Sequence, residues 1–470
     1  MGRKAKGRAR LTRGRRSPSM VRTSWTFGPD GKQELPLENE TIVDRVRRLY
    51  EDAFPTRLDG PRRVGFEDEF AVVDAEGGMA DVAVIFEDFP RDVWKPKRDA
   101  VLGTLIGVRR PDGLEIGLDV GRGTLEIGWP PVADLHDHVR LRADILAGVD
   151  ARLASHGFVR LEDYACQPRT LPAPEGWARK ARADIFRTLF VPDVHLQTLS
   201  ASAQIHVELA RGEVLPALEL FLAVSPVLIA LNANSPVWGG ALDPEGMLAA
   251  RQDFWNRFTT NHGFWGNVLC GTEPAQHPPR TFAALAAIAC RAKFLVRIDG
   301  GRAECPQAPF GAWAARDGRE WTDDAFRAAF LDHEGTLWWD ARPRAAYGTV
   351  EVRPMCQTRD ALASRALVLG LAENLDAALA HVRGAGSFAW WRDRQDDAQR
   401  AGLSDEGLRS RARRLVQIAK DGLARRGLGE EEFLAPLRGP LETGRSPAHA
   451  KKDLFLQYGL GGFLRHLMAP

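Results

Sequence analysis

Apolar residues recur at helical spacing in several stretches of the chain. The pattern predicts helices over residues 41–54, 135–156, 179–190, 215–232 and 361–382. From Gly384 onward the sequence is charged, helical in period and punctuated by glycine, which indicates a C-terminal helical region over residues 384–470. Within that region, residues 436–449 hold three prolines and two glycines and are expected to form a loop.

Alternating apolar and polar residues predict strands between these helices. Residues 63–131 are rich in such segments, and shorter strands are expected over 201–209, 294–298 and 347–354. Because the strands follow one another as hairpins with helices inserted between them, we expect an α+β fold rather than a doubly wound parallel sheet. The catalytic part is expected to span residues 39–383. The chain has neither a G-x-G-x-x-G fingerprint nor a G-x-x-x-x-G-K-[ST] loop, so a nucleotide site would have to be built differently.

Composition narrows the class of protein. The chain has 470 residues, of which 44% are hydrophobic and 27% charged, so wholesale disorder and fibrous repeats are excluded. The longest apolar run, residues 221–232, is interrupted by Ser225 and Pro226, and we therefore expect no membrane span. Five cysteines without a C-x-x-C pair support neither a disulfide framework nor a cysteine zinc site, and they indicate a reducing, cytoplasmic setting.

The positive charge is concentrated at the N-terminus. The formal net charge is +2, and residues 1–22 carry nine Lys or Arg and no acidic residue. We expect residues 1–38 to be a disordered, solvated tail, because blocks of like charge are usually disordered. The alternative is that the tail recruits nucleic acid or an acidic partner.

Two glutamates share one face of a predicted strand. In residues 64–73, Glu67 and Glu69 point to one side, while Asp68 points to the other side with apolar neighbours. Carboxylates two residues apart on one face repel each other unless a cation lies between them. A solvated outer face is the alternative, and this segment taken alone favours it.

A predicted hairpin over residues 114–129 adds two carboxylates. A tight turn at Arg122 and Gly123 would pair Asp119 directly with Glu126 and leave apolar residues facing each other on the other side. Like charges directly opposite each other destabilise a strand pair. We therefore expect a metal ion to offset this repulsion.

Two later strands add an imidazole and a carboxylate–guanidinium pair. His206 lies on the polar face of residues 202–209, where a ligand and a structural hydrogen-bonded histidine are about equally expected. Glu351 and Arg353 share a face of residues 347–354. They form either a simple salt bridge or a site in which Glu351 binds a metal and Arg353 binds a phosphate.

This combination of side chains favours phosphoryl transfer. Several carboxylates and one imidazole on an open sheet suit hard cations such as Mg²⁺ or Mn²⁺. Mg²⁺ in proteins commonly accompanies nucleotide phosphates, and arginines nearby would offset the charge of a transferring phosphoryl group. We therefore expect ATP to bind on the open face of a sheet through metal ions.

The order of the motifs resembles the type 2 glutamate–cysteine ligase family, also called the carboxylate–amine ligase family. No single motif is decisive, but the series covers about residues 64–377, two-thirds of the chain. The series consists of G-x-E-x-E from Gly65, the carboxylate hairpin followed by Pro130-Pro131, Gln204-x-His206, the 231–240 segment with Asn234-Ser235-Pro236, Asp340-x-Arg342-Pro343 and Gly348-Thr349-x-Glu351-x-Arg353.

The resemblance implies a fold and a reaction. The fold is a curved antiparallel sheet of the glutamine-synthetase and guanido-kinase type, flanked by helices. ATP would phosphorylate a side-chain carboxylate, classically the γ-carboxyl of L-glutamate, and an amine, classically that of L-cysteine, would displace the phosphate. The cofactors implied are ATP and Mg²⁺, with Mn²⁺ as a substitute.

The resemblance also implies roles for individual residues. It implies Glu351, Arg353 and Arg342 in catalysis, and Arg353, Asn234 and Ser235 in binding ATP. The metal ligands it implies are Glu67, Glu69, Asp119, Glu126, His206 and Glu351.

The sequence departs from the family pattern near the substrate pockets. Cys356 stands where the family usually has an acidic residue, and Ala250 precedes Arg251 where the family commonly has a serine. Residues 262–335 do not align by eye. The sequence therefore supports the binding of ATP and metal ions better than it supports a particular acid and a particular amine as substrates.

Two further functions and one metal site are alternatives. The same mechanism could act on another amine or on a peptide, and a non-catalytic protein could retain nucleotide while its basic tail recruits a partner. His136 and His138 form an H-x-H pair at a predicted helix start. We expect them to be solvated rather than to bind a metal, because no third ligand is near in the sequence.

Overall fold

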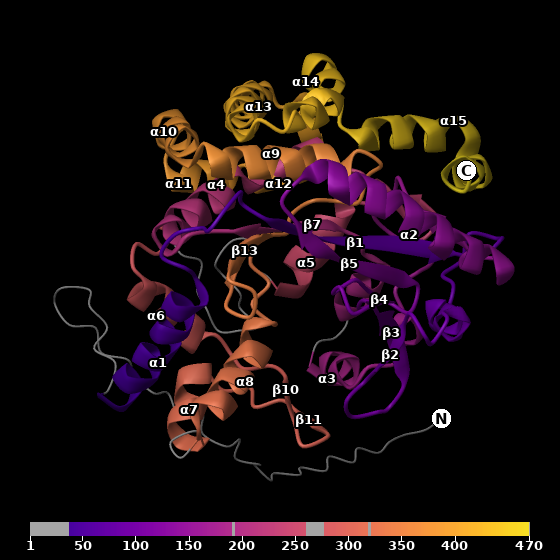
Figure 1. The fold of residues 1–470 in the computed structure, drawn as a ribbon. Coiled ribbons are helices and arrows are strands. Elements are labelled where there is room, and N and C mark those ends of the chain that lie inside the picture. Colours follow the sequence, from indigo (N-terminus) through magenta and orange to yellow (C-terminus); the bar gives the residue numbers. More distant parts are fainter. Residues whose placement is uncertain (1–36, 190–192, 260–276, 318–320, 470) are drawn as a thin grey trace, which may run out of the picture.

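The centre of the protein is an open antiparallel sheet with a layer of helices packed on one face (Figure 1). The other face lines a cleft. The computed structural model describes residues 37–189, 193–259, 277–317 and 321–469. Along the sheet the strands follow the order β12-β13-β7-β1-β5-β4-β3-β2, and β6 pairs with the end of β1. The strands are β1 (Val64–Val73), β2 (Lys95–Arg98), β3 (Leu105–Arg109), β4 (Glu115–Leu118), β5 (Thr124–Val132), β6 (Val159–Leu161), β7 (Ala203–Glu208), β12 (Ala341–Arg344) and β13 (Thr349–Val352), and two small sheets pair β8 (Val237–Trp238) with β9 (Ala241–Leu242) and β10 (Arg297–Asp299) with β11 (Arg302–Glu304).

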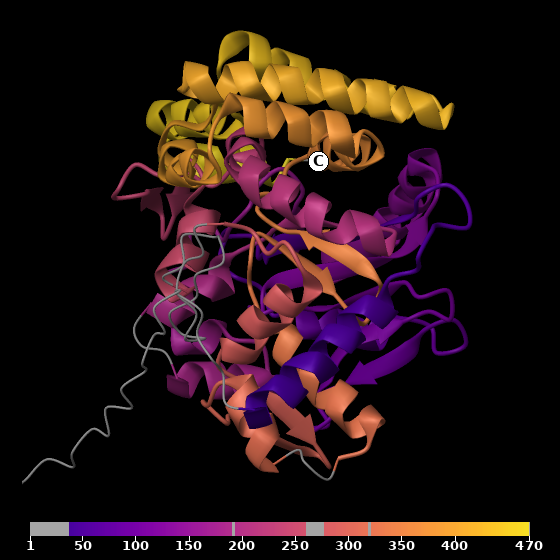
Figure 2. The ribbon, with the colours of Figure 1, turned by 90° about the vertical axis from the view of Figure 1, so that its left-hand side faces the viewer.

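Two layers of helices cover the side of the sheet away from the cleft, and further helices lie on the opposite side (Figure 1). The α-helices are α1 (Leu37–Ala53), α2 (Leu135–Ser155), α3 (Ala181–Leu189), α4 (Val214–Asn232), α5 (Ala250–Thr259), α6 (Phe282–Arg291), α7 (Phe310–Asp317), α8 (Asp323–Glu334), α9 (Ala361–Glu373), α10 (Leu375–Ala385), α11 (Phe388–Asp393), α12 (Gln395–Ala401), α13 (Glu406–Arg426), α14 (Arg438–Thr443) and α15 (Pro447–Leu467). Helices α4 and α9 pack on the sheet, and Figure 2 shows the C-terminal helices as an outer layer above them. Helices α3 and α8 lie on the cleft side (Figure 1).

The alternation predicted for β1 explains the two faces of the sheet. Phe66, Asp68 and Phe70 are buried toward the helices, whereas Glu67 and Glu69 line the cleft. One face of β1 is therefore structural, and the other is free for chemistry.

Helix α4 confirms the predicted helix over residues 215–232, and Ser225 and Pro226 interrupt the apolar run without ending the helix. The Ser225 hydroxyl donates a hydrogen bond to the Phe221 carbonyl within the helix, and Pro226 lies inside the helix. By length and composition alone, Arg211–Asn232 could cross a membrane. Most of its side chains are buried inside the protein, however, as expected of a core helix.

Two predictions for the C-terminal helices were wrong. Residues 361–382 form two helices, because the chain breaks at Asn374, whose side-chain amide donates to the Ile418 carbonyl. Residues 436–449 are largely helical, since Pro440 and Pro447 occupy first turns, where proline is tolerated.

Two smaller expectations also failed. Of the predicted strand 294–298, only the last two residues belong to a strand, β10. His138 is not solvated: it is fully buried against the rings of Phe66 and Trp129, with centroid separations of 4.2 and 5.2 Å. Burial lowers the pKa of His138 to about 3, so its imidazole is neutral in the folded protein.

Candidate active site

The cleft on the open face of the sheet gathers most of the residues predicted from the sequence. Its walls come from the sheet, from the chain around the start of α3, and from the segment between α8 and β12. The predicted residues that line it are Glu67, Glu69, Asp119, Glu126, Arg342 and Arg353. His206 and Glu351 lie directly beside them, in contact with Glu67 and Arg342.

Glu67, His206 and Glu351 form a compact cluster of metal-binding groups. His206 and Glu351 are direct cross-strand neighbours on β7 and β13, and His206 Nε2 lies 3.1 Å from Glu67 Oε1 and 3.9 Å from Glu351 Oε2. One ligand atom from each residue lies within 4.8 Å of the other two. Two carboxylates and an imidazole at this spacing fit a divalent cation such as Mg²⁺ or Mn²⁺.

The carboxylate hairpin has a different register from the one expected. Glu126 on β5 lies opposite Gly117 on β4 and opposite Glu69 on β1, so Asp119 is not its cross-strand partner. The register differs by two residues, which keeps every side chain on its predicted face. At the turn, Gly121 forms a β-bridge with Trp177, and it is packed tightly: a Cβ there would lie 2.2 Å from the Thr198 carbonyl oxygen.

Burial and acidic groups that lie close together raise the pKa of two glutamates in this part of the cleft. Burial and the nearby Asp119 raise the pKa of Glu69 to about 7. Burial, Asp119 and Glu67 raise the pKa of Glu126 to about 8. Glu126 therefore does face another carboxylate across a strand pair, as predicted, but its cross-strand partner is Glu69 on β1 rather than Asp119.

Three arginines surround Glu351, which is fully buried. Arg342 donates to both of its carboxylate oxygens, at 3.0 and 3.2 Å, Arg344 donates at 2.7 Å, and Arg353 makes a further ion pair. Burial alone would raise the pKa of Glu351, but these guanidinium groups hold it well below its usual range. Arg353 also donates to Gln204 Oε1 at 2.6 Å.

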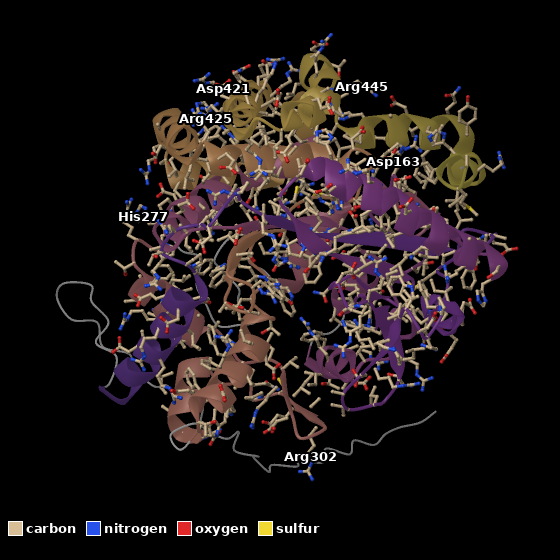
Figure 3. The ribbon with its side chains drawn as sticks, viewed as in Figure 1. Asp163, His277, Arg302, Asp421, Arg425 and Arg445 are labelled. Atoms are coloured by element: carbon tan, nitrogen blue, oxygen red, sulfur yellow. The ribbon has the colours of Figure 1, made fainter. Side chains whose placement is uncertain are left out.

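Asn234 and Ser235 lie outside the lining of the cleft. Both are buried. The Asn234 amide donates to the Gln357 carbonyl and to Asp163, which is labelled in Figure 3. Asp163 also pairs with Lys451 of α15. Ser235 Oγ accepts from the backbone N–H of Arg251 at 3.0 Å. Their contacts join the C-terminal helix to the segments behind the cleft.

Sequence reasoning missed several cations of the cleft. Arg344 could have been found, because it is two residues from Arg342 on one strand and must share its face. Lys97, Lys180 and Arg182 also line the cleft. They come from β2 and from the start of α3, far from the acidic motifs in sequence, and no local signal points to them.

The comparisons with known proteins agree with this geometry. The model of glutamate–cysteine ligase family 2 matches residues 63–270 and 289–467, so the match extends beyond residue 377 into the C-terminal helices. The glutamate–cysteine ligase EgtA of Mycolicibacterium smegmatis is 29% identical over 371 residues, which cover 76% of this chain and 82% of that relative.

Two solved structures share the fold at low sequence identity. A glutamate–cysteine ligase from Francisella tularensis, in complex with AMP, has a TM-score of 0.53 and 11% identity, with 88% of each chain covered. A bifunctional glutathione synthetase from Pasteurella multocida has a TM-score of 0.52 and 12% identity. That match covers 93% of this chain and 53% of the bifunctional protein, so the chain spans about half of its length.

These matches confirm the predicted family and the α+β fold with its antiparallel sheet and helical C-terminal region. They favour an enzyme over a non-catalytic nucleotide-binding protein. The basic tail on which that alternative relied lies outside the described residues. Because the family model matches well over half of the sequence, the chain belongs to glutamate–cysteine ligase family 2 and is a carboxylate–amine ligase.

Proposed function

We propose that the protein uses ATP and Mg²⁺ to join L-glutamate to the amine of L-cysteine, with γ-glutamylcysteine, ADP and phosphate as products. The observation that carries the proposal is the Glu67–His206–Glu351 cluster with Arg353 beside it. Supporting it, the relative EgtA is named a glutamate–cysteine ligase, and the similar structure from F. tularensis contains AMP. A reducing, cytoplasmic location is part of the proposal and agrees with the free thiols of all four described cysteines.

Six residues would hold the metal ions. Glu67, His206 and Glu351 supply the compact cluster, and Glu69, Asp119 and Glu126 supply further oxygen ligands in the same cleft. Bound Mg²⁺ would neutralise phosphate charge and polarise the phosphoryl group. Mn²⁺ has the same preference for oxygen ligands and would substitute for it.

We expect Arg342 and Arg353 to have different roles at the transferring phosphate. Arg342 donates to Glu351 and to the carbonyls of Glu334 and Leu337, at 3.2 and 2.9 Å, so it is fixed and orients Glu351. Among the described residues, the Arg353 guanidinium bonds only to side chains, those of Glu351 and Gln204. We expect Arg353 to exchange one of these contacts for an oxygen of the γ-phosphate, where it stabilises developing charge.

The reaction then needs no covalent protein nucleophile. A γ-carboxylate oxygen of glutamate attacks the γ-phosphorus of ATP, and ADP leaves. The neutral amine attacks the carbonyl carbon of the acyl phosphate, phosphate leaves with the bridging oxygen, and the amine loses a proton. Positioning and electrostatic stabilisation supply most of such a rate enhancement. None of the described cysteines lines the cleft.

The proposal is tested by ATP-dependent phosphate release with glutamate and cysteine added singly and together. The wild type should release phosphate at a substantial rate only with both amino acids. Glu67→Gln should reduce this rate by at least about 100-fold, because the loss of a ligand charge weakens a metal site that organises the transition state. Glu76→Gln, on the exposed turn after β1, is the matched control and should be fully active. Undiminished turnover in Glu67→Gln would refute the site.

The second candidate is the same chemistry with a larger amine or a peptide as acceptor. Trp177, Trp255 and Trp338 line the cleft, which suits an acceptor bulkier than cysteine. The same assay with a panel of amino acids and dipeptides distinguishes the two: phosphate release with glutamate and another acceptor, but not with cysteine, would select the second.

A further inference from the structure

Two cations that line the cleft, Lys180 and Arg182, make no ion pair within the described residues, and Arg182 is the one with a guanidinium group. Arg182 lies in the first turn of α3 and reaches the cleft from outside the sheet. Its guanidinium donates one hydrogen bond, from Nη2 to the Gly335 carbonyl at 3.2 Å, and makes no ion pair within the described residues. The other arginines that line the cleft, Arg342, Arg344 and Arg353, all pair with Glu351.

The residues around Arg182 pack against its guanidinium group but accept few of its hydrogen bonds. Its guanidinium carbon lies 5.3 Å from the ring centroid of Phe186 and 5.9 Å from that of Trp338. The Gly335 carbonyl that it contacts also accepts from Arg342 at 3.3 Å, so two guanidinium groups converge on one oxygen. A guanidinium group has five N–H donors, and most of those of Arg182 are left for a ligand. Burial lowers its pKa, but arginine stays charged.

The unused donors of Arg182 favour an anionic ligand here. Asp119 and Glu126 act on the Arg182 guanidinium through their charge, but neither makes an ion pair with it within the described residues. In the proposed reaction, the metal cluster and Arg353 serve the phosphates of ATP. Each amino-acid substrate brings an additional α-carboxylate that does not react and still needs a cation. The planar fork of a guanidinium group matches a carboxylate in two parallel hydrogen bonds.

We propose that Arg182 binds the α-carboxylate of an amino-acid substrate and so selects α-amino acids over neutral analogues. This inference rests on the proposed function, and it names the group that positions the substrate. The α-carboxylate belongs either to the donor, glutamate, or to the acceptor, and substrate analogues distinguish the two.

The test compares each amino acid with its neutral α-amide in the wild type and in Arg182→Ala. The wild type should lose about 10- to 100-fold in kcat/KM when the recognised substrate carries an α-amide, which is the usual effect of losing a charge-assisted pair. Arg182→Ala should show this loss with the natural amino acid and no longer distinguish acid from amide. Sensitivity to glutamate α-amide identifies the donor, and sensitivity to cysteine amide identifies the acceptor.

Two controls separate binding from folding. Arg187→Ala, on the same helix, removes an arginine that pairs with Asp184 and does not line the cleft, so kcat/KM should be unchanged. Arg182→Lys keeps the charge but not the fork, and its loss should be intermediate. Added guanidinium ion should partly restore the activity of Arg182→Ala with the acid, but not with the amide.

Several outcomes would overturn the inference. Arg182→Ala could lower kcat/KM equally for acid and amide, it could raise only the KM for ATP, or it could change nothing. If the wild type released no phosphate with any substrate, the proposed function would be contradicted, whatever the role of Arg182. Calorimetric titration with L-glutamate and L-cysteine would then decide the inference: binding lost in Arg182→Ala supports it, and unchanged or absent binding rejects it.

Discussion

Arg365 on α9 is ion-paired with Asp68 on β1, directly behind the acidic face of the cleft. Both side chains are almost completely buried, at 1% and 0% exposed. Arg365 also donates to the backbone carbonyl of Glu67 at 2.9 Å, and the indole N–H of Trp129 donates to Asp68 at 2.9 Å. Since Asp68 lies between Glu67 and Glu69, this pair fixes the strand that carries both glutamates.

Asp68→Asn should therefore destabilise the protein strongly. The substitution leaves Arg365 buried without its counter-charge, and breaking a buried pair in this way costs about 3–5 kcal/mol. Urea unfolding followed by circular dichroism measures the loss. Asp137→Asn, which breaks an exposed pair with Arg140 on α2, should cost less than about 1 kcal/mol. Equal losses in the two variants would contradict the assigned role of the buried pair.

Thr349→Val should weaken Mn²⁺ binding without removing a ligand. Thr349 Oγ1 lies 3.0 Å from His206 Nδ1, and this hydrogen bond orients the imidazole toward Glu67. Loss of such an orienting contact typically lowers metal affinity by about 10- to 100-fold. Calorimetry with Mn²⁺ alone measures the change, and an affinity equal to that of the wild type would remove His206 from the ligand set.

His138 should make the protein less stable in mild acid. Its pKa is lowered to about 3 by burial, whereas an unfolded histidine titrates near 6.5, so the unfolded state binds more protons between these values. The contribution of His138 to the free energy of unfolding therefore has its full value above pH 6.5. It decreases as the pH falls, by about 2 kcal/mol at pH 5. Urea midpoints at pH 8 and pH 5 should differ less in His138→Leu; an unchanged difference would show that other groups set the pH dependence.

Gly370→Ala should separate two helices that cross closely. A Cβ at Gly370 of α9 would lie 2.3 Å from the backbone oxygen of Ala419 on α13, which cannot give way as a side chain can. Such overpacking costs about 1–3 kcal/mol. Gly384→Ala, in α10 with open space around it, should instead stabilise by about 0.5–1 kcal/mol, because alanine favours the helix. Thermal unfolding of both variants gives the comparison, and effects of the same sign would count against the close crossing.

The faces of the strands could be predicted from the sequence because a strand has a period of two. That rule alone placed Glu67 and Glu69 on one side of β1 and Asp68 on the other. It could not set the register of the hairpin, since a shift by two residues keeps the same faces and the turn residue Gly121 pairs with Trp177 in a distant segment.

Contacts between distant segments account for the rest. The break at Asn374 depends on a hydrogen bond to α13, and the burial of His138 depends on Phe66. Arg182 enters the cleft from a helix outside the sheet, so no spacing relates it to the acidic motifs. Such groupings arise only from tertiary packing.

The most direct test of the proposed reaction follows an oxygen atom. L-Glutamate labelled with ¹⁸O in its γ-carboxylate is incubated with the wild-type enzyme, ATP, Mg²⁺ and L-cysteine, and the released phosphate is examined by ³¹P NMR. Because a γ-carboxylate oxygen becomes the bridge of the acyl phosphate, one ¹⁸O should appear in each phosphate, together with γ-glutamylcysteine. Phosphate that carries no ¹⁸O, or label that appears only with another acceptor, would contradict the account.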